Sequence, residues 1–399
     1  MQTTVMQAGE VSLAKWTKQI KRSALQEMLA AASRPGILSF ALGLPAPEFF
    51  PAEAYAQAAA QVLANEPRAL QYGPPLQVPK THIVRLMAER GVRCSESQVL
   101  LTAGAQQGMN LLSRLLLEPG DQVIIEQKCY PGFRQVLDPF EPDILAVPTD
   151  MDTGMDVQAV ESLLERGAQP SLVYAIPEGQ NPLAVSMNAV KREQLVELAR
   201  QWQVPIIEDD AYGFLNYNRE VAKPMRALGA DWVFYVGSFS KIMAPALRVG
   251  WLVVPEQFMA KLSIVKEASD IDTATFTQRI ISAYLDTGEL PAHLAFLRSK
   301  YQLRRDTMLD ALEKHFPRAA QWRTPASGVF IWVELPDEID TTELLRLAIE
   351  TAKVAFIPGS AFCVGGGNRE MNSMRLNFSN CKPDDITEGI QRLARVIQR

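Results

Sequence analysis

Histidine and cysteine are scarce in this 399-residue sequence, which contains three histidines and four cysteines. Cys94, Cys129, Cys363 and Cys381 share no C-x-x-C spacing, and the histidines lie far apart along the chain. Closely spaced ligands of these types are typical of zinc sites, and dense cysteine frameworks are typical of small secreted proteins. The sequence therefore predicts neither a metal site nor a disulfide framework.

Long apolar runs and dense basic runs are also missing. No stretch approaches the roughly 20 apolar residues that a membrane-spanning helix needs, and the start MQTTVMQAGE lacks the charged-then-apolar order of a secretion signal. The net charge is −5, and the basic stretch formed by Lys15, Lys18, Lys21 and Arg22 is short. Such a chain is poorly suited to follow a phosphate backbone. We expect a cytoplasmic protein with no membrane and no nucleic acid as partners.

Short apolar runs alternate with helical patterns between about residues 98 and 255. The seven runs are VLLTAG (99–104), QVIIE (122–126), ILAVP (144–148), LVYAIP (172–177), VPIIEDD (204–210), WVFYVGS (232–238) and WLVVP (251–255). Continuously apolar strands separated by amphipathic helices are typical of α/β proteins with a mostly parallel sheet between helices. We therefore predict a seven-stranded, mostly parallel sheet in a large α/β domain.

One covering helix is expected at 188–202. The apolar residues that recur there at roughly helical spacing are Val190, Leu195, Leu198 and Trp202. The charged residues expected to face away are Lys191, Arg192, Glu193 and Arg200. The pattern favours a crossover helix with its apolar stripe on the sheet.

A smaller α+β domain is predicted beyond residue 257. Two long helical patterns run to residue 314 and are followed by FIWVEL (330–335), a helix near 341–352, VAFIP (354–358), MRLNF (374–378) and a helix near 383–398. Single cores stop growing at roughly 250–300 residues, so more than one domain is expected. We predict an N-terminal segment that joins the small domain (1–45), a large cofactor-binding domain (46–288) and a small C-terminal domain (289–399).

The central chemical signal is SFSKIMAPALR (238–248), which follows the apolar run WVFYVG. A parallel strand delivers the side chains at its end to the carboxyl edge of the sheet, where open α/β sheets bind ligands. Ser238, Ser240 and Arg248 can supply hydroxyl donors and a guanidinium fork for a phosphate dianion. Lys241 lies among them, and neighbouring cations would lower the pKa of its amine, as pyridoxal 5′-phosphate (PLP) chemistry requires. Taken alone, such a lysine is more often a solvated surface residue.

An acidic pair, Asp209 and Asp210, follows another strand, with Tyr212 close behind. A carboxylate there can keep a pyridine nitrogen protonated, so that the ring accepts electrons, and a tyrosine can donate to the phenolic oxygen of the ring. The pair could instead bind Mg²⁺ or cap a helix. Because no Walker-type glycine loop accompanies it, we predict no metal.

TAGAQQG (102–108) follows a strand and opens an apolar helix. The backbone N–H groups of Ala105 and Gln106 can hold a phosphate there, with help from the helix dipole. Tyr130, just past the next strand, could stack on the pyridine face, or it could be a core aromatic.

Two further polar residues are candidates for contacts with a substrate. Asn181, in IPEGQNP, can hydrogen-bond the ring oxygen and a substrate carboxylate together. Arg375, in MRLNF, is the best candidate for a bidentate clamp on the substrate α-carboxylate, although a strand arginine is more often a surface salt-bridge partner.

In this order and spacing, the segments resemble fold-type I PLP enzymes of the class I/II aminotransferase group, and within it the 2-aminoadipate and kynurenine aminotransferase branch. The resemblance covers nearly the whole chain from about residue 20. RPGILSFALGLPAPEFFP (34–51) is similar to the N-terminal substrate segment of that branch, with Gly43 near the carboxylate site. LQYGP (70–74) is similar to the segment whose tyrosine, here Tyr72, reaches the phosphate of the neighbouring subunit.

The resemblance implies a role for each of these residues. Lys241 is implied as the catalytic lysine, which holds PLP as a Schiff base. Cofactor contacts are implied for Ala105, Gln106, Tyr130, Asn181, Asp209, Tyr212, Ser238, Ser240, Arg248 and Tyr72. Substrate contacts are implied for Gly43, Asn181 and Arg375. A homodimer with active sites at the subunit interface is implied as well.

The sequence departs from the family pattern at several positions. The family segment Q-N-P-T-G is Q-N-P-L-A here, with Leu183 and Ala184, and the phosphate-loop serine is Ala105. Glycine positions of the family are occupied by Leu42, Ala246, Ser327 and Val78. We expect most of these changes to add bulk near the cofactor.

Two positions bear on the substrate. Gln26 falls where branch members that accept acidic substrates carry an arginine, which makes a neutral or cationic substrate more plausible. Glu178 would favour a cationic side chain if it faced the site, but a solvated glutamate in a turn is the more common case.

The predicted reaction is transamination between an L-α-amino acid and a 2-oxo acid, with 2-oxoglutarate or pyruvate as the expected acceptor. Lys241 would move the Cα proton as general base and acid. One alternative keeps Lys241 and PLP but ends in elimination, cyclisation or decarboxylation of a specialised amino acid, for example a cationic one. A remote alternative is a PLP-binding regulator, for which the roughly 35 residues before SFALGLP leave too little room for a helix-turn-helix module.

Overall fold

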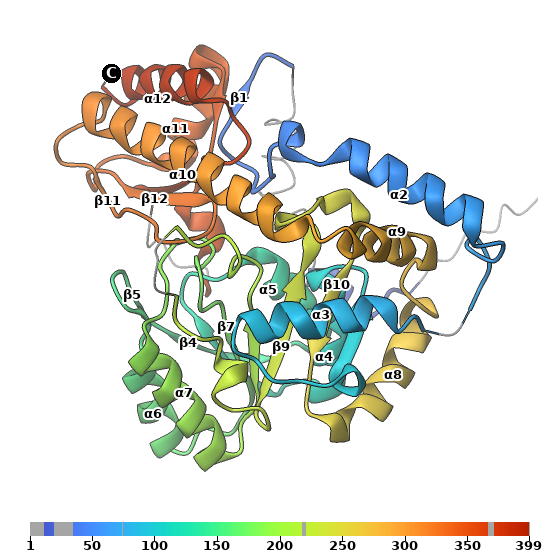
Figure 1. Cartoon of the computed structure of the whole chain (residues 1–399). Coiled ribbons are helices and arrows are strands. Elements are labelled where there is room, and N and C mark those ends of the chain that lie inside the picture. The colour runs from blue at the N-terminus through green and yellow to red at the C-terminus, as the bar shows by residue number, and fades with distance from the viewer. Residues whose placement is uncertain (1–11, 20–34, 74, 218–220, 366–370, 399) are drawn as a thin grey trace, which may run out of the picture.

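The computed structural model of the chain describes residues 12–19, 35–73, 75–217, 221–365 and 371–398. Its main sheet has seven strands in the order β2-β10-β9-β8-β7-β3-β4 (Figure 1). Only β10 runs antiparallel to its neighbours. The strands are β2 (Val99–Thr102), β3 (Gln122–Glu126), β4 (Asp143–Val147), β7 (Pro170–Ala175), β8 (Ile206–Asp209), β9 (Val233–Ser238) and β10 (Gly250–Val253). All seven predicted strands are confirmed.

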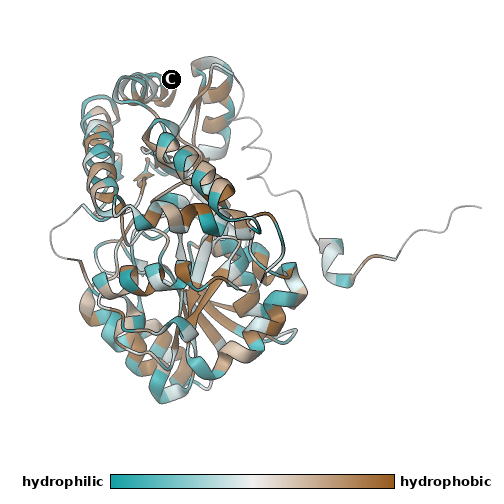
Figure 2. Cartoon of the chain, turned by 45° about the vertical axis from the view of Figure 1, so that its right-hand side comes forward, coloured by the Kyte–Doolittle hydropathy of each residue, from teal (hydrophilic) through white to brown (hydrophobic). Residues whose placement is uncertain are grey.

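Helices cover both faces of this sheet, which explains why its strands are continuously apolar. In β3, Val123 and Ile125 pack with α4 (Ala105–Leu116), α5 (Pro131–Leu137) and α8 (Glu256–Asp270). Ile124, between them, packs on the opposite face with α6 (Val157–Glu165) and α7 (Ala189–Trp202). The apolar strands accordingly lie inside a shell of helices with polar outer surfaces (Figure 2).

The predicted crossover helix is α7, and Leu195 and Leu198 of its expected apolar stripe are buried, but other positions differ from the expectation. Val190 and Trp202 are exposed, whereas the Arg192 side chain, expected to face away, is fully buried. Arg192 turns inward because its guanidinium has partners there: it donates to the carbonyl oxygens of Met187 and Pro177 and pairs with Glu178. A hydrophobic count along the helix cannot detect such an ion pair.

Three helices rather than two occupy the region from 256 to 315: α8, α9 (Thr275–Asp286) and α10 (Leu290–His315). The expectation of two was wrong because the chain turns twice, at Ile271 (φ +64°) and at Gly288 (φ +73°). Neither turn interrupts the apolar periodicity strongly enough to be seen in the sequence.

The second sheet has four antiparallel strands in the order β11-β12-β15-β14. They are β11 (Gln321–Trp322), β12 (Phe330–Glu334), β15 (Ser373–Asn377) and β14 (Ile357–Pro358). This sheet is accompanied by α10, α11 (Thr341–Leu347) with a π-helical turn at Ala348–Ala352, and α12 (Pro383–Ile397). Figure 1 shows these elements, in orange and red, grouped beside the seven-stranded sheet.

Residues 38–40, which precede α2, contact this second unit. The short strand β1 (Leu38–Ser39) pairs in parallel with β13 (Val354–Ala355), and Gly389 of α12 leaves room for the ring of Phe40. The chain then passes through α2 (Ala52–Asn65) and α3 (Val78–Glu89) to the main sheet, where the hairpin of β5 (Thr149–Asp150) and β6 (Gly154–Met155) follows β4.

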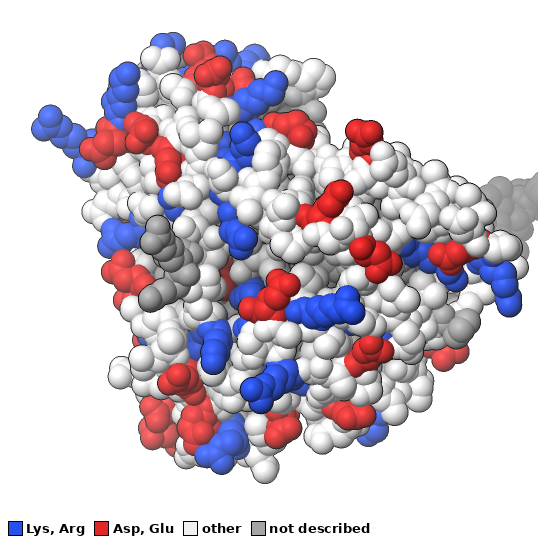
Figure 3. Space-filling model, in the orientation of Figure 1, with Lys and Arg blue, Asp and Glu red and all other residues white. Residues whose placement is uncertain are grey.

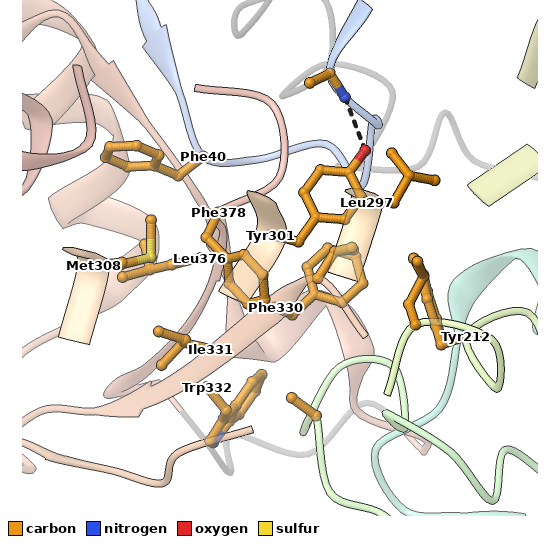
Figure 4. Close-up of a cluster of buried hydrophobic side chains, with 14 of the residues drawn as sticks. Phe40, Tyr212, Leu297, Tyr301, Met308, Phe330, Ile331, Trp332, Leu376 and Phe378 are labelled. Carbon is orange, nitrogen blue, oxygen red and sulfur yellow. Dashed lines mark hydrogen bonds between the residues drawn. The ribbon is translucent and has the colours of Figure 1, made fainter. Parts of the chain in front are cut away.

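The two sheets meet across a shared apolar core. Figure 4 shows Phe330 of β12 between Tyr301 of α10 and Tyr212, which follows β8. Tyr301 is fully buried, and its hydroxyl accepts a hydrogen bond from Ala46 N at 3.3 Å. This core places the small sheet over the carboxyl edge of the large one.

Surface charge, cysteine pairing and helix apolarity complete the description of the fold. Acidic and basic side chains are interspersed over the face in Figure 3. None of the four cysteines forms a disulfide. Within the described residues, no helix has both the length and the apolarity to cross a bilayer.

Candidate active site

A cavity of about 360 Å³ lies at the carboxyl edge of the seven-stranded sheet, under the small sheet. Strands β8 and β9 end in it, helix α4 begins in it, and segment 42–44 and β15 close it from the other side. The residues predicted from the sequence that line this cavity are Gly43, Ala105, Gln106, Tyr130, Asn181, Asp209, Tyr212, Ser238, Ser240, Lys241, Arg248 and Arg375. The tertiary structure thus brings together every predicted site residue except Tyr72.

Lys241 ends the short 3₁₀ turn Phe239–Lys241 that follows β9. Its Nζ donates a hydrogen bond to the Gly43 carbonyl oxygen at 2.6 Å. Burial lowers the pKa of the Lys241 amine to about 8, and the nearby Arg375 and Arg248 act in the same direction. A useful fraction of this amine is therefore neutral and nucleophilic near physiological pH.

Asp209, the last residue of β8, presents one satisfied and one unsatisfied oxygen. Its Oδ2 accepts a hydrogen bond from the Tyr174 hydroxyl at 2.7 Å, while the buried Oδ1 has no partner. Burial raises the pKa of Asp209 to about 6, although the hydrogen bond from Tyr174 opposes this rise. An unpartnered buried acceptor in a cavity wall fits an N–H donor of a bound heterocycle.

Tyr174 escaped the sequence analysis. It lies in the middle of β7, within the apolar run LVYAIP, and its side chain is almost completely buried. The available signal was a phenol in an otherwise aliphatic strand, because a buried tyrosine hydroxyl needs a partner. Only the pairing of β7 with β8 shows that Asp209 is that partner.

A phosphate cradle lies at the start of α4. Ala105 and Gln106 are the first two residues of this helix, so their N–H groups have no intrahelical acceptor. Arg248 crosses this end of the helix, where its Nη2 donates to the Ala103 carbonyl oxygen at 2.8 Å. Gly104 suits this position because its φ of +88° is one that residues with a side chain rarely adopt, and a Cβ would also lie 2.6 Å from that Nη2 atom.

The two predicted serines lie on the other side of the cradle. Ser238 ends β9, and its hydroxyl oxygen accepts a hydrogen bond from Ser240 N at 3.1 Å. The Ser238 proton therefore stays available for another acceptor. With the helix N–H groups and the Arg248 guanidinium, the cradle offers several donors and no carboxylate among its described residues, which suits a phosphate dianion.

Arg375 is a buried cation without an acidic partner among the described residues. Its Nη1 donates to Asn181 Oδ1 at 2.5 Å and its Nη2 to the Ala41 carbonyl oxygen at 2.7 Å, while Nε has no partner. Burial lowers the pKa of Arg375 to about 10. Since an uncompensated buried charge is unfavourable, this guanidinium is suited to receive an anion such as an α-carboxylate.

The Arg375 guanidinium lies over two phenyl rings, and neither phenylalanine was predicted as a site residue. The guanidinium carbon lies 3.9 Å from the ring centre of Phe330 and 4.8 Å from that of Phe362. Cation–π contacts of this kind partly replace the missing counter-charge. No local sequence pattern marks these phenylalanines, because they are core-type residues in short strands and turns.

Tyr130 and Tyr212 enclose the centre of the cavity. The Tyr130 hydroxyl lies 3.5 Å from Gln106 Oε1, and the Tyr212 ring meets Phe330 edge to face with ring centres 6.0 Å apart. Burial raises the pKa of both phenols. Both hydroxyls therefore remain protonated donors at neutral pH, as a contact with a ring oxygen would require.

Two residues singled out in the sequence are not among the described residues that line this cavity. Tyr72 is 79% exposed and does not line the cavity, and the expected role of its hydroxyl concerns a neighbouring subunit. Gln26 lies outside the described residues.

The departures from the family pattern differ in their relation to the cavity. Leu42 and Ala105 line the cavity, whereas Leu183, Ala184 and Ser327 do not. Neither do Val78 and Ala246. Leu183 and Ala184 are buried beside the cavity, and Ala184 adopts the left-handed conformation (φ +60°) for which glycine is better suited.

Glu178 is also in neither of the two expected places. Its side chain is buried and does not line the cavity, and its Oε1 lies 2.5 Å from Nη2 of Arg192. It is therefore neither a solvated turn residue nor a partner for a cationic substrate.

The described residues fit PLP and offer no metal site. Asp209 Oδ1 supplies the acceptor for a ring nitrogen, the start of α4 supplies the phosphate cradle, and Lys241 supplies an amine between them. By contrast, no group of three or more histidine, cysteine, aspartate or glutamate side chains that could hold a metal ion occurs in the described part of the chain.

Comparisons with known proteins agree on one family. The family model "Aminotransferase class I and II" matches residues 40–393. Aromatic-amino-acid aminotransferase 1 of Thermococcus litoralis is 38% identical over 392 residues, which cover 95% of this chain and 92% of that protein. Among solved structures, the Pyrococcus horikoshii kynurenine aminotransferase has a TM-score of 0.90 at 36% identity and covers 97% of this chain and 96% of that chain. The alpha-aminoadipate aminotransferase of Thermus thermophilus, complexed with N-(5'-phosphopyridoxyl)-L-leucine, has a TM-score of 0.89 at 33% identity and covers 97% of both chains.

Proposed function

Because the chain belongs to the class I and II aminotransferases, we propose that it transfers the amino group of L-α-amino acids with neutral, largely apolar side chains. The family assignment makes the protein a PLP-dependent transaminase whose substrates are amino acids and 2-oxo acids. The class of side chain and the roles of individual residues are our proposal.

The observation that carries the proposed side-chain class is the set of charges around the cavity. Of the described residues that line it, only Asp209, Lys241, Arg248 and Arg375 are charged. The first three surround the proposed cofactor position, and Arg375 is the one cation left for a substrate carboxylate. A second carboxylate or an ammonium group on the substrate would find no opposite charge there, and burying an unpaired charge is strongly unfavourable.

The remaining wall is apolar. Leu42, Leu44, Ile357, Phe330 and Phe362 line the side of the cavity formed by the N-terminal segment and the small sheet. Such a surface favours aliphatic and aromatic side chains by burying them. The name of the Thermococcus litoralis relative, an aromatic-amino-acid aminotransferase, supports the same class. By the same reasoning we propose pyruvate, rather than 2-oxoglutarate, as the preferred acceptor.

We assign the cofactor contacts as follows. Asp209 would keep the ring nitrogen protonated, Asn181 and Tyr212 would donate to the ring oxygen, and Tyr130 would lie against the ring face. The phosphate would be held by Ala105, Gln106, Ser238, Ser240 and Arg248. When bound, PLP supplies an aldehyde that takes up the substrate amino group and a ring that accepts electrons from Cα.

Lys241 performs the proton transfer in this proposal. With a pKa lowered to about 8, its amine can accept a proton from the substrate Cα and return it on the other side of the reaction, as an efficient general base and acid does when its pKa lies near the working pH. Arg375 fixes the substrate through its α-carboxylate, so that Cα stays within reach of Nζ. Gly43 contributes its carbonyl oxygen, which holds Nζ at 2.6 Å.

We further propose a cytoplasmic homodimer. Leu70 and Tyr72 are 76% and 79% exposed, and burial of this segment against a second copy would remove apolar surface from water. Tyr72 would then reach the phosphate in the partner's site. For the domains we propose 1–45 with 289–399 as the small unit and 46–288 as the large one, supported by the pairing of β1 with β13 and the start of α10 at Leu290.

A donor panel tests the proposed substrate class. The purified holoenzyme is given leucine, methionine, phenylalanine, glutamate, 2-aminoadipate or lysine, each with pyruvate and with 2-oxoglutarate, and the 2-oxo acid products are quantified. We expect the three apolar donors to be used with the highest kcat/KM. Preferential use of glutamate, 2-aminoadipate or lysine would contradict the proposal.

A further inference from the structure

A buried ion pair lies beside the cavity and takes no part in the proposed chemistry. Glu178 and Arg192 are both completely enclosed, and Glu178 Oε1 lies 2.5 Å from Arg192 Nη2. The Arg192 guanidinium also donates to four carbonyl oxygens, those of Pro177, Met187, Ala222 and Lys223. Arg192 is therefore fixed in place, and it in turn fixes one oxygen of the Glu178 carboxylate.

The other oxygen of Glu178 joins two segments that are far apart in the sequence. Oε2 accepts hydrogen bonds from the hydroxyls of Ser186 at 2.9 Å and Ser327 at 3.1 Å, and the Asn216 amide nitrogen lies 3.4 Å away. The two hydroxyl oxygens are themselves 2.9 Å apart. Ser186 also accepts a hydrogen bond from Gly179 N. Each hydroxyl has a single proton, so the carboxylate is satisfied when both donate to Oε2.

Each joined segment carries a residue that contacts the substrate clamp. Glu178 and Ser186 bracket the loop that contains Asn181, whose Oδ1 accepts from Arg375 Nη1. Ser327 lies three residues before Phe330, the ring on which the Arg375 guanidinium stacks at 3.9 Å. The two segments also touch directly, because a Cβ on Gly179 would lie only 3.0 Å from Gly328 Cα.

We propose that Glu178 is a positioning residue. Its carboxylate joins the loop that contains Asn181 to the segment around Ser327 that leads into β12, and so aligns Arg375 for the substrate α-carboxylate. The inference rests on the proposed role of Arg375. It also gives a purpose to Ser327, which stands where the family pattern has glycine: its hydroxyl supplies the bond that connects the two segments.

The charge of Glu178 is needed for this role. One carboxylate accepts from Arg192, Ser186 and Ser327 at once, whereas an amide at the same place has one acceptor oxygen and adds donors. Glu178→Gln would also leave Arg192 as an uncompensated buried cation, which can prevent folding. The test is therefore built on Ser327→Ala, which removes one hydroxyl and leaves the ion pair intact.

The matched control is Ser171→Ala. Ser171 also donates its hydroxyl to a carboxylate, Asp121 Oδ2 at 2.7 Å, but it lies near the start of β7, at the opposite edge of the large sheet from the cavity. Both variants lose one hydroxyl-to-carboxylate hydrogen bond, so their effects on thermal stability should be comparable. Only Ser327→Ala should disturb the substrate clamp.

The experiment measures KM, kcat and the dissociation constant for PLP on the holoenzymes. We expect Ser327→Ala to raise KM for the amino acid about fivefold, which corresponds to about 1 kcal/mol, the net contribution of one ordinary hydrogen bond. Its kcat should match that of Ser171→Ala, because Lys241 and Asp209 belong to other segments. Its PLP affinity should fall by a smaller factor than KM rises, because Asn181 is the one assigned cofactor contact in the Glu178–Ser186 loop. Ser186→Ala, which removes the second donor to Oε2, should shift KM in the same direction and replaces Ser327→Ala if that protein does not fold.

Two results would overturn the proposal. One is a KM for Ser327→Ala and Ser186→Ala that equals that of Ser171→Ala. The other is a rise in KM accompanied by equally large losses of kcat and PLP affinity, which would indicate a merely structural role. The measurement uses whichever amino acid the wild-type enzyme prefers, because the α-carboxylate is common to all of them. A wrong side-chain class in the donor panel therefore leaves this test intact.

Discussion

Replacing Tyr174 with phenylalanine should move the acid limb of the pH–activity profile to higher pH. The Tyr174 hydroxyl donates a hydrogen bond to Asp209 Oδ2 at 2.7 Å. Among the described residues, no other side chain donates to that oxygen. This bond favours the ionised carboxylate, whose pKa burial has already raised to about 6. Without it, protonation of Asp209 becomes easier, and a protonated Asp209 cannot keep the cofactor nitrogen positively charged.

The magnitude follows from the strength of the lost bond. A hydrogen bond to a charged group contributes about 1.5–3 kcal/mol, and about 1.36 kcal/mol corresponds to one pH unit, so the pKa of Asp209 should rise by roughly one to two. At pH 7 the ionised fraction would fall from about nine-tenths to between about one-half and one-tenth. We therefore expect kcat/KM at pH 7 to fall roughly two- to tenfold and to recover largely by about pH 9.

The assay is the pH dependence of kcat/KM for Tyr174→Phe beside a control with the same chemistry. Tyr235→Phe provides it, because the Tyr235 hydroxyl donates to Asp210 Oδ2 at 2.8 Å on the neighbouring strand, and Asp210 does not line the cavity but pairs with Arg90. Both variants remove one buried phenol hydroxyl. The titration of Lys241 is common to both proteins and cancels in the comparison.

The reasoning would be refuted if the two variants had the same acid limb. It would equally be refuted if Tyr174→Phe lost activity that high pH did not restore, because a defect in packing does not depend on the ionisation of Asp209.

Three further predictions concern the cofactor and the clamp. Lys241→Ala should lose at least about 10³-fold in kcat, because it removes the general base; full turnover of this variant, measured by formation of the 2-oxo acid, would contradict the mechanism. Arg375→Gln should lower kcat/KM roughly 10²- to 10³-fold for every amino acid, since a lost buried ion-pair partner costs about 3–5 kcal/mol, and an effect confined to one side-chain class would argue against a carboxylate clamp. Gly104→Ala should weaken PLP binding by about fivefold or more, because it combines strain at φ +88° with a Cβ 2.6 Å from Arg248 Nη2; a spectroscopic titration with PLP measures this, and unchanged affinity would show that the cradle tolerates a side chain there.

Most of the cofactor-binding residues that the sequence predicted share one property: they end or follow strands, or open a helix, at the carboxyl edge of a parallel sheet. Lys241, Asp209, Asn181 and Ala105 all belong to such segments, and connections in an open α/β sheet bring these segments to one edge. Tyr174 and Phe330 were not found, because their contribution depends on which strand lies beside theirs and which sheet lies above. That information is not local in the chain.

The sequence by itself determined the seven strands of the large sheet, because burial on both faces leaves continuously apolar runs that are visible without a partner. It also determined the cofactor, and it pointed to Lys241 as the lysine proposed to carry it. Only the tertiary structure decided the places of Glu178 and Arg192, since the free energy of a buried charge depends on the partners that the fold brings within reach. The same holds for Ser327 and for the phenyl rings around Arg375. Their roles come from contacts between two sheets, and no periodicity along the chain encodes such contacts.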